Sequence, residues 1–160
     1  MENKGLFFLL LLIFCYMKNS NGDQIDDICK KNLDPNLCAN SLRKDPKGSS
    51  DDFKGLANTI LNQCLNNAKE NLGQVQKLAP NKCQQICIQQ YNLCINTYIP
   101  NSVTQLRSDQ FTQAIGSILQ SGDRALTCED SCGQSQLSQK NNDFAHLVLV
   151  SADVLKTKLQ

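Results

Sequence analysis

Cysteine is the residue type in this 160-residue chain whose chemistry the sequence indicates most clearly. Eight of the nine cysteines lie beyond residue 22, and an even number in a secreted chain is typical of disulfide pairing. Zinc is the alternative, but the Cys-x-x-Cys spacing of zinc sites is absent and the chain has a single histidine. We therefore expect four disulfides, no metal and no cofactor, from Cys29, Cys38, Cys64, Cys83, Cys87, Cys94, Cys128 and Cys132.

The acidic residues and the histidine do not form a catalytic pattern. A general acid, base or nucleophile needs a partner held close to it. The single histidine, His146, is expected at the edge of an apolar helix face, as an ordinary surface or half-buried residue. Neighbouring acids such as Asp26-Asp27, Asp51-Asp52 and Glu129-Asp130 diverge on a helix, and helix starts attract acids for capping alone. We therefore predict that the protein is not an enzyme.

The first residues indicate a secretory signal peptide. Lys4 precedes an unbroken apolar run of twelve residues that ends at Met17. This run is shorter than a membrane span but has the length of a signal-peptide core, so a membrane anchor is the less favoured alternative. Ser20 and Gly22 are small enough for the positions before a cleavage site. We expect a signal peptide over residues 1–22 and a single domain over residues 23–160.

The charge of the mature chain argues against two classes of partner. Beyond residue 22 there are fourteen basic and fourteen acidic residues, which gives a net charge of zero. A neutral chain without a basic patch is a poor ligand for nucleic acids or anionic membranes. Asparagine and glutamine are common instead, with 17 and 16 copies in the full 160 residues, so an amide-rich storage protein stays an alternative.

Four stretches have apolar residues at three- and four-residue steps, the spacing of one helix face. Before them, a polar segment broken by Pro35 and Pro46 allows only short helical turns, which Cys29 and Cys38 can tie into a hairpin. No stretch with a period of two competes. The predicted architecture is an all-α, up-and-down four-helix bundle with an N-terminal disulfide-closed helical hairpin. Its helices are expected over residues 53–78, 81–98, 111–126 and 141–159.

Local signals place the ends of these helices. Asp51 or Asp52 can cap the first helix, and Pro80 is expected to end it. Pro100 is expected to stop the second helix, whose outward side should carry Gln84, Gln85, Gln89 and Asn92.

In the third helix, Ser108 with Asp109 supplies a predicted N-cap. The Ser121-Gly122-Asp123 stretch is expected to interrupt this helix and to kink it.

The cysteine positions test this topology. Residues that face each other in an antiparallel helix pair have residue numbers with a common midpoint. The pairs Cys83/Cys132 and Cys87/Cys128 share the midpoint 107.5, near the connection between the second and third helices. Their four-residue spacing puts both sulfurs of each helix on one face. By the same reasoning Cys64 and Cys94, with their midpoint at residue 79, are predicted to pair across the Ala79-Pro80 turn.

Several short motifs, in this order and spacing, resemble the plant invertase and pectin methylesterase inhibitor family. The resemblance covers the whole predicted mature chain and implies a four-helix bundle with an N-terminal hairpin, with bridges Cys29–Cys38 and Cys87–Cys128. Besides the first cysteine pair, the motifs are Asp45-Pro46-Lys47, Gly55-Leu56-Ala57, Cys87-x-x-x-Tyr91, Thr127-Cys128-Glu129-Asp130 and Asn142-x-Phe144-x-x-Leu147.

The departures from the family pattern are also informative. Cys83 and Cys132 stand where the family usually has alanine and phenylalanine, a paired change that an added bridge requires. Cys94 likewise replaces a common alanine. Leu119-Gln120-Ser121-Gly122 replaces a typical Ser-Ala-Ala-Leu stretch, and we expect it to exchange tight packing for a polar, flexible turn that alters the inhibitory face.

The resemblance implies a secreted inhibitor of a plant cell-wall carbohydrate enzyme, monomeric when free, binding its target 1:1 in the apoplast rather than the vacuole. The target is expected to be pectin methylesterase rather than acid invertase, because Asp109-Gln110-Phe111 replaces the Pro-Lys-Phe stretch of invertase inhibitors. Outward residues of the second and third helices, with the linker 100–107, should cover the substrate cleft. The candidate contacts are Arg107, Asp109 and Gln110.

Overall fold

The computed structural model describes residues 20–44, 52–133 and 136–159. Most of the predicted signal peptide, the Asp45-Pro46-Lys47 motif and Asp51 lie outside these ranges. Within them every regular element is helical, which confirms the predicted all-α class. The elements are α2 (Ser20–Cys29), α3 (Pro35–Arg43), α4 (Phe53–Val75), α5 (Lys82–Leu93), η1 (Cys94–Tyr98), α6 (Ile99–Arg107), α7 (Phe111–Cys132) and α8 (Ser138–Lys156).

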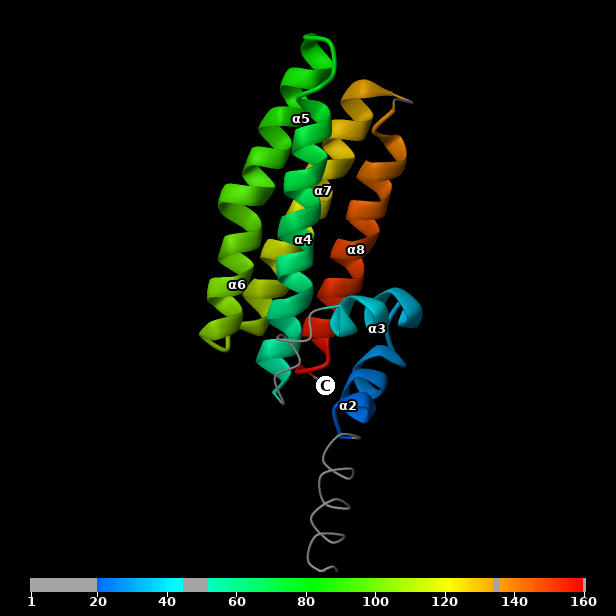
Figure 1. Ribbon diagram of the computed structural model, residues 1–160. Coiled ribbons are helices and arrows are strands. Elements are labelled where there is room, and N and C mark those ends of the chain that lie inside the picture. Colours follow the sequence, from blue (N-terminus) through cyan, green and yellow to red (C-terminus); the bar gives the residue numbers. More distant parts are fainter. Residues whose placement is uncertain (1–19, 45–51, 134–135, 160) are drawn as a thin grey trace, which may run out of the picture.

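Four helical rods lie side by side and form the predicted bundle (Figure 1). The first is α4, the second is the run α5–η1–α6, and α7 and α8 are the third and fourth. Helices α2 and α3 form a separate hairpin that contacts α4 and α8 at one end of the bundle (Figure 1). The Cys29–Cys38 disulfide, with its Cα atoms 5.5 Å apart, closes this hairpin.

The start of α4 is where the sequence places it, but its last turn is not. Asp52 caps the helix, since its Oδ1 accepts a hydrogen bond of 2.7 Å from the Gly55 N–H. The helix ends at Val75, three residues before the predicted end. The amide of Gln84 donates to the carbonyls of Val75 and Leu78, so it satisfies groups that the helix end leaves unpaired. Gln84 is therefore buried, and its predicted outward position is wrong.

Pro100 does not stop the second rod. The turn Cys94–Tyr98 is a π-helix, and the Ile99 N–H donates to the carbonyl of Cys94, five residues earlier. This wider turn shifts the hydrogen-bond register, and α6 then restarts with Pro100 in its first turn. A first-turn residue has no helical acceptor for its N–H, so proline costs little there. The predicted linker 100–107 is consequently helical.

Ser121 and Gly122 do not interrupt α7, which runs unbroken from Phe111 to Cys132. Both residues are buried, and α7 lies beside α8 (Figure 1). A Cβ atom on Gly122 would come within 3.0 Å of Val148 Cγ1 on α8. The stretch therefore provides close packing, and the predicted polar, flexible turn is wrong.

A buried polar cluster fixes the register of all four rods. The hydroxyl of Tyr91 on α5 donates to Asn141 Oδ1 on α8 at 2.7 Å and accepts from Asn71 Nδ2 on α4 at 3.1 Å. The Asn141 amide donates in turn to Glu129 on α7, at 2.8 Å. Burial, the largest effect, raises the pKa of Tyr91, so its hydroxyl keeps its proton. Because a half-satisfied buried network is costly, sliding any one rod would be opposed.

Candidate functional site

Two disulfides join α5 to α7 and hold their outer surfaces in one arrangement. Cys83 is bonded to Cys132 and Cys87 to Cys128, with Cα separations of 5.0 and 4.6 Å. These are the pairs given by the shared midpoint of the residue numbers. Three of these sulfurs lie close together, but all of them are in disulfides and so are not thiolate ligands for a metal.

The predicted Cys64–Cys94 bond is wrong, because both residues are free thiols in the structure. Cys94 lies seven residues after Cys87, on the helix face that points to α7. The Cys94 sulfur donates to the carbonyl of Ser121 at 3.3 Å. The Cys64 sulfur lies instead 3.2 Å from Ser151 Oγ on α8. Equal distance from a turn fixes the height of a residue but not the direction in which it points. Burial raises the pKa of each thiol to about 12.

Arg107, Asp109 and Gln110 come together at the turn between α6 and α7, and all three are exposed. Lys54 at the start of α4 binds this turn, because its Nζ donates to Asp109 Oδ2 at 2.7 Å and to the Arg107 carbonyl at 3.2 Å. Asp109 has a φ of 59°, which aspartate tolerates better than most residues. The predicted Ser108–Asp109 cap is wrong, since Gln110 precedes α7 and makes no side-chain cap.

The outer face of α5 and η1 is uncharged and hollowed. A shallow hollow of about 480 Å³ lies there, and the predicted outward residues Gln85, Gln89 and Asn92 line it. The π-helical turn adds Asn96 and Thr97 to the same lining. Turns of this kind inside α-helices are frequent at functional sites. This turn was not predicted, because no residue pattern distinguishes it from an ordinary helix.

Beside this face, Arg124 of α7 lies over the ring of Tyr98 in η1, with 5.8 Å from Cζ to the ring centroid. Both side chains are partly exposed. Neither Tyr98 nor Arg124 is among the contacts predicted from the sequence. The sequence gives no signal of this contact, because nothing in it indicates which residue of another helix Arg124 will meet.

A larger groove of about 710 Å³ lies among α3, α4 and α8. Its lining is dominated by amides, including Asn40, Asn62 and Asn66, and carries one cation, Lys44, and one anion, Glu70. The groove is on the hairpin side of the bundle and does not involve the disulfide-locked pair α5 and α7.

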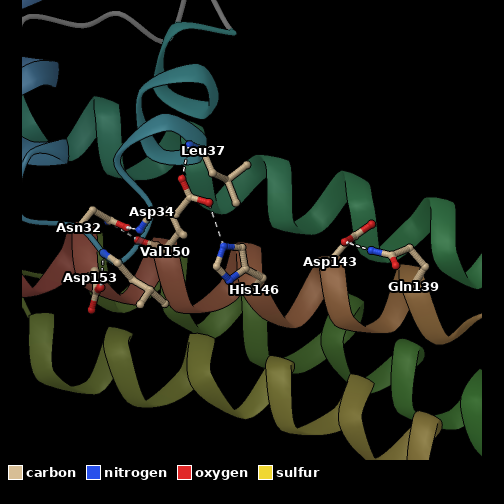
Figure 2. A network of polar contacts seen from close by, with 9 residues as sticks. Asn32, Asp34, Leu37, Gln139, Asp143, His146, Val150 and Asp153 are labelled. Carbon is tan, nitrogen blue, oxygen red and sulfur yellow. Dashed lines mark hydrogen bonds and ion pairs between the residues drawn. The ribbon is translucent and has the colours of Figure 1, made fainter.

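His146 fastens the hairpin to the bundle (Figure 2). Its Nε2 lies 3.1 Å from Asp34 Oδ2, while Asp34 Oδ1 accepts from the Leu37 N–H and so caps α3. Both hydrogen bonds hold the pKa of Asp34 below its usual range, and the bond from Leu37 has the larger effect. Nearby, Asn32 donates to the carbonyl of Val150 (Figure 2). The geometry gives His146 a structural role.

No helix within the described ranges is long and apolar enough to cross a membrane.

Comparison with known proteins gives a family match over most of the chain. Residues 23–154 match the family model described as plant invertase/pectin methylesterase inhibitor. An Arabidopsis thaliana relative named cell wall / vacuolar inhibitor of fructosidase 1 is 24% identical, over 86% of this chain and 73% of its own. A pectinesterase inhibitor from Actinidia deliciosa is 26% identical, over 96% of this chain and 95% of its own.

Solved structures show the same fold. The crystal structure of a mutant form of a pectin methylesterase inhibitor from Arabidopsis superposes with a TM-score of 0.68, at 19% identity. The alignment covers 83% of this chain and 95% of that one. The family match, which spans far more than half of the chain, confirms the resemblance stated from the motifs. The chain belongs to the plant invertase/pectin methylesterase inhibitor family.

Proposed function

We propose that this protein is secreted to the cell wall and inhibits a plant carbohydrate enzyme there by covering its substrate cleft. The observation that carries the proposal is the pair of disulfides that join α5 to α7. A docking surface on these helices loses little conformational freedom when it binds, so modest contacts are enough for useful affinity. The family membership supplies the class of target.

The proposed surface is formed by the outer sides of α5, η1 and α7 and extends to the turn between α6 and α7. Arg107, Asp109 and Gln110 are its proposed contacts at that turn, where all three are exposed. We propose that the free protein is a monomer and that the complex is 1:1, with one target molecule on this face.

The target is proposed to be pectin methylesterase, because the Pro-Lys-Phe stretch of invertase inhibitors is replaced by Asp109-Gln110-Phe111. Acid invertase is the second candidate, since relatives named as an inhibitor of fructosidase and as putative invertase inhibitors also match this chain. Mature protein should be added to pectin methylesterase with pectin and to acid invertase with sucrose. Loss of one activity near a 1:1 ratio is expected, and loss of neither would refute the proposal.

The contacts at the turn can be tested with the triple variant Arg107→Gln, Asp109→Asn and Gln110→Ala. Asparagine is chosen at position 109 because it tolerates a positive φ and removes only the charge. The Lys54–Asp109 ion pair is solvent-exposed and contributes little to stability, so the melting curve should stay unchanged. Weaker inhibition with an unchanged melting curve is expected. Full inhibition by this variant would place the contact surface elsewhere.

A further inference from the structure

One cation of α7, Arg124, lies against the uncharged span of the second rod. The chain has no charged residue between Gln84 and Leu106, a span that covers nearly all of α5, η1 and α6. Arg124 reaches across from α7 to this span, and its guanidinium lies over the ring of Tyr98. An arginine stacked on an aromatic ring is attracted to it but keeps its hydrogen-bond donors for another partner.

The hydrogen bonds of Arg124 are incomplete. Its Nε atom is buried and has no hydrogen-bond acceptor among the described residues. No carboxylate in the part of the chain that the structure describes forms an ion pair with the Arg124 guanidinium. A buried donor without an acceptor is costly, and such groups are rare in folded proteins. The free protein therefore carries an unmet requirement for an acceptor at this position.

The surroundings of Arg124 strengthen this requirement. The side chain lies close enough to Cys94 for its charge to act on that buried thiol, in the direction that lowers the pKa. Burial has the larger effect and raises the pKa of Cys94 to about 12, so the thiol stays neutral and cannot neutralise the arginine. The amides along α5 and η1 are neutral as well.

We infer, on the basis of the proposed function, that Arg124 is the anchor of the inhibitory face and binds a carboxylate of the target enzyme. A guanidinium presents its donors as a planar fork, and a carboxylate matches this fork with two parallel hydrogen bonds. Arginine and tyrosine are, with tryptophan, the residues most enriched among those that dominate binding energy. Changes of side-chain rotamer are common when interfaces form, and we infer that such a change turns the Nε edge toward the target.

The second candidate target, acid invertase, fits this assignment directly. It hydrolyses a glycosidic bond, and enzymes of this kind use a pair of aspartate or glutamate side chains in the substrate cleft. A guanidinium on the docking face would pair with one such carboxylate. Arg124 lies about 20 Å along α7 from the turn at Asp109, taking 1.5 Å per residue. An interface of ordinary size, about 800 Å² per partner, reaches both places.

Three substitutions separate charge from packing at this position. Arg124→Gln removes the charge, Arg124→Lys keeps the charge without the fork, and Arg124→Glu reverses the charge. The matched control is Arg43→Gln, which removes an equally charged side chain from α3, where it pairs with Asp26 on the hairpin. Inhibition constants are measured against pectin methylesterase with pectin and against acid invertase with sucrose, and melting curves are recorded for every variant.

The expected result has a defined order. Arg124→Gln should weaken inhibition by about 30-fold, as for loss of one charged partner at an interface. Arg124→Lys should weaken it less than Arg124→Gln, and Arg124→Glu should weaken it more, because two like charges then face each other. Arg43→Gln should inhibit as the wild type does. Melting temperatures that fall in step with inhibition would show a packing role and would overturn the inference.

Failure of this inference differs from failure of the proposed function. If the wild type inhibits an enzyme, and Arg124→Gln and Arg124→Glu inhibit it as well as the wild type does, the anchor assignment is wrong. The inhibitor function then still stands. If the wild type inhibits neither enzyme, the proposed function is wrong and the anchor assignment falls with it.

Discussion

Gly122 and Gly116 lie in the same helix, α7, but should respond to alanine in opposite ways. A Cβ atom at Gly122 would lie 3.0 Å from Val148 Cγ1 and 3.5 Å from Val148 Cβ, with the backbone of Ala145 4.0 Å away. At Gly116 nothing lies within 4 Å of an added Cβ. The pair therefore compares the same chemical change with and without a neighbouring helix.

The expected magnitudes follow from two opposing effects. Alanine in place of glycine favours the helix by about 1 kcal/mol at either position. Forcing an extra carbon into a packed interface costs about 1 to 3 kcal/mol, and only Gly122 bears this cost. Gly116→Ala should thus raise the free energy of unfolding by up to about 1 kcal/mol. Gly122→Ala should leave it unchanged or lower it by up to about 2 kcal/mol.

Urea unfolding followed by circular dichroism, with the disulfides intact, measures both variants. The difference between them isolates the contact with α8, because the helix effect is common to both. Adding Val148→Ala makes room for the new carbon. Val148→Ala should therefore lower the free energy of unfolding less in the Gly122→Ala variant than in the wild type, by about 1 kcal/mol or more. A Gly122→Ala variant as stable as Gly116→Ala would refute the close packing of α7 on α8.

Three further outcomes are expected. Replacing Cys83 and Cys132 together by serine should cost about 2 to 3 kcal/mol, less than for an isolated loop of this length, because the Cys87–Cys128 bridge already closes most of it; an unchanged denaturation midpoint would count against this. Cys64 and Cys94 should resist maleimide in the native protein and react after unfolding in guanidinium; mass spectrometry showing no reactive thiol after unfolding would contradict their free state. Asp34 has a lowered pKa when folded, so its stabilising contribution is complete above the unfolded value of about 3.9 and is lost as the pH falls through the folded one. The melting-temperature difference between wild type and Asp34→Ala should therefore shrink in acid, and an equal difference at neutral and strongly acidic pH would exclude this role.

The elements with a strong local signal were predictable. The spacing of apolar residues located four helical stretches. Asp52, one of two predicted caps, marks the start of α4, because capping depends on the residues immediately around it. The i, i+4 cysteines on α5 and α7 gave both the antiparallel topology and the two bridges between these helices. The motif order gave the family, which the match over residues 23–154 confirms.

The candidate site was only partly accessible to the same reasoning. Arg107, Asp109 and Gln110 are exposed, as candidate contacts must be, but Arg107 ends helix α6 and does not lie in a linker as predicted. The contact of Arg124 with Tyr98 was not predicted, because these residues lie on different helices, 26 positions apart in the sequence. The continuation of the rod through Pro100 depended on the π-turn before it, which shifts the hydrogen-bond register.

The sequence alone determines which side of each helix is apolar and at what height each cysteine lies, since both follow from the geometry of a single helix. Only the tertiary structure decides which neighbour a side chain meets. Cys94 donates to the Ser121 carbonyl on α7 and is not bonded to Cys64, and Gly122 packs against Val148 rather than forming a flexible turn. The reason is that helix periodicity fixes a direction around one axis, whereas the position of the next axis comes from packing the whole bundle.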